Sequence, residues 1–99
     1  MATQALTDAQ ISARLKTLEG WNREGDTLVK SFKLPTYAAG LVFATTVGAI
    51  AEGHDHHPDM TIGYKTVKVV FSTHDAGNKI SQKDLDIAAA INALPYPKK

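Results

Sequence analysis

Residues 60–72, MTIGYKTVKVVFS, carry the pattern that decides the fold of this chain. Met60, Ile62 and Tyr64 occupy every second position of the first half, and the same spacing continues in the second half with Val67, Val69 and Phe71. Successive side chains of a β-strand point to opposite faces of the sheet, so this alternation is typical of half-buried strands. We expect residues 60–72 to form two paired strands.

A second strand pair is predicted nearer the N-terminus. The turn-forming residues Glu24-Gly25-Asp26 separate two short segments that could pair as a hairpin. In the second of these segments Leu28, Lys30 and Phe32 share one face. We therefore expect a strand here with one buried face.

Helices are predicted before, between and after the two strand pairs. Thr7 and Gln10 have the spacing of a capping box at the start of an amphipathic helix over Thr7–Glu19. Ser81 and Asp84 repeat that signature at the start of the last helix. The predicted order is α-β-β-α-β-β-α, and the fold class is α+β: a four-stranded antiparallel sheet with three helices packed on one face.

The middle helix, Ala38–Ala51, is apolar on nearly all sides and is interrupted mainly by Thr45 and Thr46. A helix that is apolar all round usually packs on two sides. A domain this small offers one side, its own sheet. We therefore expect the second apolar side of this helix to pack against another copy of the chain, in a homodimer or a homotetramer.

Length and composition limit the classes of function. Ninety-nine residues, 43% of them hydrophobic, suit a single domain over residues 1–99, which we expect to be ordered from about 6 to 94. A net charge of +1 gives no reason to expect nucleic acid, and the absence of cysteine excludes thiolate chemistry and disulfides. No apolar run approaches the roughly 20 residues of a membrane span. With no signal peptide in evidence, the expected location is the cytoplasm.

All four histidines lie between His54 and His74, and three belong to the run Glu52-Gly53-His54-Asp55-His56-His57-Pro58. Histidine exchanges protons readily near neutral pH, which makes it the usual general acid or base. His74 follows the last predicted strand. If the two loops lie at the same end of the sheet, His56, His57 and His74 could line one pocket.

Simpler interpretations of these residues stay open. His54 would be a solvated surface residue, and Asp84 a helix cap. Tyr64 could belong to the core or to the pocket. Glu52 could be a plain helix-end carboxylate, although a negative charge is unfavourable near a helix C-terminus. Three histidines could also ligate zinc, but the neighbouring His56 and His57 argue against it, and no metal is expected.

At these spacings the chain resembles the pterin-4α-carbinolamine dehydratases. Members of that family show an acidic residue, three spacers, His-His-Pro, an aromatic, a third histidine and an aspartate. The resemblance extends from Leu6 to Ile91, and two departures are Met60 in place of an aromatic and a longer loop at 77–80. The matching positions here are Glu52, His56, His57, Pro58, Tyr64, His74 and Asp84.

The resemblance implies a hydro-lyase that dehydrates a 4a-hydroxytetrahydropterin to the quinonoid dihydropterin. It implies no cofactor, because the reaction is proton transfer alone, and it implies recycling of pterin for an aromatic amino-acid hydroxylase. The catalytic residues would be His56, His57, His74 and Glu52, with Tyr64 and Asp84 in support. The substrate would contact His56, His57, Pro58, Thr73, His74, Asp75 and Ala76.

Two other functions remain as alternatives. Animal members of this family also serve as dimerisation partners of a homeodomain transcription factor, which would make the chain a binding module. A metal-binding protein is the third class, and metal analysis after purification would distinguish it.

Overall fold

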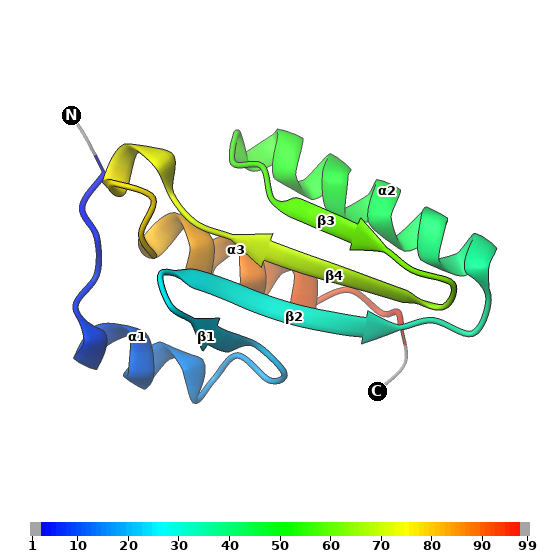
Figure 1. Ribbon diagram of the computed structural model, residues 1–99, viewed down its shortest axis with the longest axis horizontal. Helices are drawn as coiled ribbons and strands as arrows, with labels where there is room; N and C mark the ends of the chain where they lie inside the picture. The colour runs from blue at the N-terminus through cyan, green and yellow to red at the C-terminus, as the bar shows by residue number, and fades with distance from the viewer. Residues whose placement is uncertain (1–2, 98–99) are drawn as a thin grey trace.

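The computed structural model describes residues 3–97, and its elements follow the predicted order (Figure 1). The helices are α1 (Asp8–Leu15), α2 (Tyr37–His54) and α3 (Gln82–Asn92), and a short 3-10 helix, η1, covers His74–Ala76. The strands are β1 (Asn22–Glu24), β2 (Thr27–Lys33), β3 (Asp59–Ile62) and β4 (Thr66–Phe71). The predicted α+β fold class is therefore confirmed.

The four strands form one antiparallel sheet in the order β1-β2-β4-β3. The two central strands, β2 and β4, pair from Leu28 opposite Phe71 to Lys33 opposite Thr66. The turn after β3 brings the chain back as β4, so β3 becomes one edge of the sheet and β1 the other. In this arrangement the start of β3 and the end of β4 lie at the same end of the sheet.

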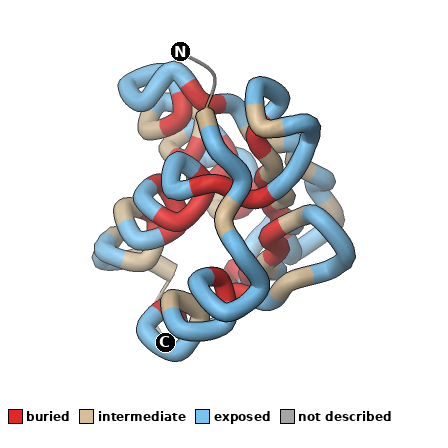
Figure 2. Tube along the Cα trace, turned by 90° about the vertical axis from the view of Figure 1, so that its left-hand side faces the viewer, coloured by how far each residue is buried: buried red, intermediate tan, exposed pale blue. Residues whose placement is uncertain are grey.

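One face of the sheet forms the core and the other is polar. Leu28, Phe32, Val67, Val69 and Phe71 face inward and are buried. The outward positions of β2, β3 and β4 include Ser31, Lys33, Thr61, Thr66 and Lys68, and all five are exposed. Figure 2 shows the buried segments gathered inside, with exposed turns around them. The helices supply the other half of the core with Ile11, Phe43, Val47, Leu85, Ile87 and Ile91.

Aromatic rings connect the layers of this core. The Phe32 ring lies 4.6 Å from Phe43 of α2 between centroids. Trp21 lies 6.2 Å from Phe32 and 6.0 Å from Phe71. Such tilted and edge-on pairs add to the stabilisation that burial of their area provides.

The first helix is shorter than the predicted Thr7–Glu19. Its capping box forms as expected between Thr7 and Gln10, but regular helix ends at Leu15. Thr17 donates its hydroxyl to the carbonyl of Arg14, and the backbone N–H of Thr17 bonds the same carbonyl in a tighter turn. A side-chain bond of this kind competes with the helical pattern and favours its end.

The middle helix is longer than predicted, and part of its surface is both apolar and exposed. Thr36 caps it, and it continues beyond Ala51 to His54. Phe43 and Val47 face the core, whereas Tyr37, Leu41 and Val42 are 49%, 41% and 58% exposed. No helix among residues 3–97 is long and apolar enough to cross a membrane.

Replacement of Phe43 by alanine is expected to lower the free energy of unfolding by about 3–5 kcal/mol, because it leaves a cavity where α2 meets the sheet. Thr45→Ala is the matched control on the exposed side of the same helix, with an expected change within about 0.5 kcal/mol. Urea unfolding followed by circular dichroism measures both. Equal losses in the two variants would contradict this account of the core.

Candidate active site

The two histidine-bearing loops meet at one end of the sheet, which is the condition for the three histidines to line one pocket. His56 and His57 come between α2 and β3, and His74 begins η1 after β4. Because Asp59 of β3 pairs with Val70 of β4, the residues just before β3 and just after β4 are neighbours. The antiparallel pairing of β3 with β4 therefore brings the three histidines together.

Asp55 ends α2 in a left-handed conformation, with φ 50° and ψ 44°. Its backbone N–H bonds the carbonyls of Ala51 and Glu52, and the N–H of His56 also bonds Ala51. Left-handed residues of this kind commonly end helices and satisfy their last carbonyls. The sharp change of direction sends His56 inward and leaves His57 at the surface.

His56 is the buried member of the cluster, with 8% of its surface exposed. Its ring stacks on Phe71 at 5.7 Å between centroids, with 13° between the planes. Nε2 lies 2.6 Å from Oδ1 of Asp84. Packing on one side and a carboxylate on the other fix the position of this imidazole.

Asp84 is fully buried, and its carboxylate has three hydrogen-bonding partners. Its Oδ2 accepts hydrogen bonds from the backbone N–H of Ser81 and from the hydroxyl of Thr73, each at 2.8 Å. The Thr73 and Ser81 hydroxyls are themselves 2.5 Å apart. Oδ1 faces His56, and the carboxylate lies at the positive N-terminal end of α3, where a negative charge is stabilised. Asp84 is thus both the predicted helix cap and a ligand of the buried histidine.

The other two histidines have their own oxygen partners. Nε2 of His57 lies 2.5 Å from Oε1 of Glu52, and both side chains are more than half exposed. Nδ1 of His74 lies 3.1 Å from Oδ1 of Asn78. Asn78 is itself held by a backbone bond from its N–H to Thr73. Each of the three imidazoles therefore has one ring nitrogen oriented by an oxygen.

A cavity of about 300 Å³ opens between these loops, within the range of small-molecule sites. Its lining is Asp55, His56, His57, Ser72, Thr73, His74, Asp75 and Lys83. Across residues 3–97 no group of three or more histidine and acidic side chains is arranged to hold a metal ion. The lining suits a polar organic molecule and proton transfer.

The predicted site residues fall into three groups. His56, His57, Thr73, His74 and Asp75 line the cavity directly. Glu52 and Asp84 contact it through the histidines that they orient. Three predicted residues do not line it: Pro58, Ala76 and Tyr64.

Tyr64 lies apart from the rest of the site. It is 73% exposed and belongs to the turn between β3 and β4. Strand β3 extends the chain away from His57 by about 3.3 Å per residue, so the turn is at the opposite end of the sheet. The spacing of Tyr64 to the histidines along the chain gave no indication of this direction.

Asp55, Ser72 and Lys83 line the cavity without having been predicted. Asp55 adjoins the histidine pair and Ser72 precedes Thr73, so proximity in sequence was a usable signal for both. Lys83 is one residue from Asp84 on the first turn of α3. The sequence gives little indication that Lys83 lines the cavity, because this depends on α3 beginning beside the end of β4.

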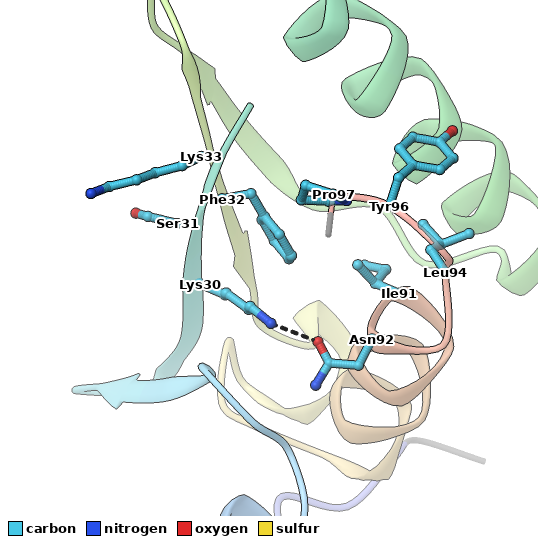
Figure 3. Close-up of a pocket in the computed structure, with 9 residues that line it drawn as sticks. All are labelled: Lys30, Ser31, Phe32, Lys33, Ile91, Asn92, Leu94, Tyr96 and Pro97. Carbon is cyan, nitrogen blue, oxygen red and sulfur yellow. Dashed lines mark hydrogen bonds between the residues drawn. The ribbon is translucent and has the colours of Figure 1, made fainter. Parts of the chain in front are cut away.

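A second cavity, of about 190 Å³, lies between β2 and the end of α3 (Figure 3). Lys30 points toward Asn92 there and donates to its Oδ1 at 2.9 Å, whereas Lys33 points away. Lys30 also bonds the carbonyl of Glu19. Its ammonium is occupied by structural contacts, and no histidine lines this cavity, so the candidate active site is the one at the histidine loops.

A family of known proteins matches most of this chain. The family described as "Pterin 4 alpha carbinolamine dehydratase" matches residues 4–94. A protein of Natronomonas pharaonis is 45% identical over 89 residues, which cover 90% of this chain and 94% of that protein. A protein of Roseiflexus sp. is 42% identical over 94 residues, covering 95% and 99%. Both carry the name "putative pterin-4-alpha-carbinolamine dehydratase".

Solved structures show the same fold. The crystal structure of a "transcriptional coactivator/pterin dehydratase" from Brucella melitensis aligns with a TM-score of 0.84 and 28% identity, over 91% of this chain and 97% of that one. A pterin dehydratase-like protein described as a RuBisCO assembly factor of the α-carboxysome aligns at 0.63 with 22% identity, over 76% and 88%. The second likeness concerns the fold alone. From the family match over most of its length and the identity to these relatives, the chain belongs to the pterin 4 alpha carbinolamine dehydratase family.

Proposed function

We propose that this protein dehydrates a 4a-hydroxytetrahydropterin to the quinonoid dihydropterin by histidine acid–base catalysis. The observation that carries the proposal is the set of three imidazoles around one cavity, each oriented by its own oxygen partner. Family membership supports the pterin as substrate. The reaction would make the protein a hydro-lyase that recycles pterin for an aromatic amino-acid hydroxylase, with the cytoplasm as its expected location.

The reaction requires one acid and one base. The C4a–O bond breaks as the hydroxyl gains a proton and leaves as water. N5 loses its proton, and its electron pair forms the C4a=N5 double bond. Nothing is oxidised or reduced, so the residues need only move protons and hold the ring. Each proton transfer by a positioned group typically contributes about 10²–10⁴-fold to the rate.

The hydrogen-bond partners suggest which nitrogen of each ring is available. A carboxylate only accepts hydrogen bonds, so Nε2 of His56 carries the proton that faces Asp84. The amide oxygen of Asn78 likewise accepts from Nδ1 of His74, which leaves Nε2 of His74 with a free lone pair. These tautomers are assigned from the hydrogen-bond network.

The same partners favour distinct roles for His56 and His74. A second proton on His56 would occupy Nδ1, and the positive ring would stay paired through its Nε2–H with the buried Asp84 carboxylate, which suits the acid. His74 faces a neutral amide and has a free Nε2, which suits the base that takes the N5 proton. His57, exposed and held by Glu52, would hold the substrate. By the family resemblance, the backbone around Thr73–Ala76 would cradle the amide edge of the pterin.

Wild-type protein is expected to accelerate loss of chemically generated 4a-hydroxytetrahydropterin in stopped-flow absorbance. His74→Ala should lower kcat by roughly 10²–10⁴-fold, because the base is removed. His54→Ala is the control, since His54 is exposed and does not line the cavity. A wild-type rate equal to that of buffer would contradict the proposed reaction.

Asp84→Asn should reduce both activity and stability. It takes the negative charge from His56 and disturbs a buried hydrogen-bonded group, which costs about 1–3 kcal/mol of stability. Thr7→Ala provides a control, because it breaks the equivalent capping box of α1, at a cost of about 1 kcal/mol, and Thr7 does not line the cavity. We expect kcat to fall in Asp84→Asn and to stay at the wild-type value in Thr7→Ala, with stability measured by urea unfolding.

We also propose that the chain forms a homodimer or homotetramer through the exposed apolar face of α2. Tyr37, Leu41 and Val42 are large apolar residues on that face, and exposure of such side chains together indicates an interaction surface. The cavity lies at the end of the same helix, so assembly and catalysis would use different parts of α2.

The double variant Leu41→Asp, Val42→Asp should lower the mass observed by sedimentation equilibrium, because charged side chains oppose burial of the face. Lys68→Asp, on the outer face of the sheet, is the control for a change in charge alone. A stable monomer of the wild-type protein at micromolar concentration would overturn the proposed assembly.

A further inference from the structure

We infer that the side chain of Asp55 is a substrate-binding group that accepts hydrogen bonds from the 2-amino group of the pterin. The inference rests on the proposed function for the class of ligand. Its own basis is the cavity, an Asp55 carboxylate that has no partner among residues 3–97, and the place of that carboxylate at the C-terminal end of α2.

Asp55 lines the histidine cavity and adjoins the buried His56 in sequence. Its carboxylate forms no salt bridge or hydrogen bond with any other side chain or backbone group of residues 3–97. The carboxylates of Glu52 and Asp84, by contrast, are both engaged by histidines. Asp55 is therefore free to meet a ligand.

One feature makes aspartate an unfavourable choice here for stability alone. Its left-handed backbone, with φ 50°, is a conformation that aspartate tolerates. Its position, however, is the C-terminal end of the 18-residue helix α2, whose dipole disfavours a negative charge. A residue that fits its local structure poorly is expected mainly at functional sites.

Asp75, the other carboxylate on the cavity, lacks this signature. It lies in the three-residue helix η1 and not at the C-terminal end of a long helix. Its charge therefore meets no unfavourable helix dipole, whereas that of Asp55 does. This difference selects Asp55 as the residue whose charge serves a ligand.

The chemistry of the remaining lining groups restricts what Asp55 could bind. Lys83 can only donate hydrogen bonds, and the hydroxyl of Thr73 already donates to Asp84. A pterin presents N–H donors at its 2-amino group, and a carboxylate is the strongest acceptor for them. With the amide edge held by the backbone of 73–76, the 2-amino group would remain for Asp55.

The test compares binding of two stable ligands by calorimetry: 6-methyl-7,8-dihydropterin and 6-methyl-7,8-dihydrolumazine, in which an oxygen acceptor replaces the 2-amino donor. Wild-type protein should prefer the pterin by roughly 10- to 100-fold, since the lumazine oxygen faces a carboxylate. In Asp55→Asn the preference should fall to within about threefold, because the amide can donate as well as accept.

Asp59→Asn is the matched control. Asp59 is an exposed aspartate four residues away that does not line the cavity, and its variant should keep the wild-type preference. Asp55→Asn should also have a Tm equal to or above that of wild type, because asparagine suits the left-handed position and removes the charge from the helix end. Loss of selectivity without loss of stability would separate a binding role from a structural one.

The inference would be overturned if Asp55→Asn kept the full preference, if Asp75→Asn alone abolished it, or if wild-type protein bound neither ligand. The dehydratase assay decides the proposed reaction separately. If the preference for the pterin depends on Asp55 but the protein does not accelerate dehydration, the proposed reaction is contradicted and the binding role of Asp55 stands. If the wild-type protein accelerates the reaction but Asp55→Asn keeps the preference for the pterin, the proposed reaction stands and the binding role of Asp55 is overturned.

Discussion

The hydrogen bonds of the buried Asp84 carboxylate are the interactions on which the rest of the site depends. It begins α3 through the Ser81 backbone, holds the Thr73 hydroxyl at the end of β4, and fixes His56 after α2. Three elements far apart in sequence thus share one charged group. A fully buried charge is tolerated because it is hydrogen-bonded and lies at a helix N-terminus. The same carboxylate therefore both caps the last helix and orients His56.

Around this fixed point the site has a rigid side and an open side. His56 is packed on Phe71 and largely buried, whereas His57 and His74 are exposed and held by single contacts. A preorganised group gives precision, while exposed groups can adjust to a ligand that enters from solvent. The sheet supplies the rigidity, since β3 and β4 place both histidine loops at the same end.

The sequence was sufficient to predict the fold and to single out the histidine loops as the candidate site. Alternation over residues 60–72 and the capping signatures of Thr7 and Ser81 are local effects, and local effects can be read from one chain. The pairing of acids with histidines was not accessible in this way. Glu52 lies one turn before His56, yet it meets His57, because the left-handed Asp55 rotates the chain between them. The distance from Tyr64 to the histidines depends on strand direction and was equally hidden.

The ring contacts of the core have a consequence for observing this protein. Trp21 is the sole tryptophan of the chain, and its indole lies 6.0 Å from Phe71, the ring on which His56 stacks. Its indole N–H is held by Asn92 of α3 at 3.0 Å. One natural fluorophore therefore touches the sheet, the last helix and the layer beneath the buried imidazole. Its fluorescence emission therefore reports, without a label, on the part of the core that lies next to the buried His56.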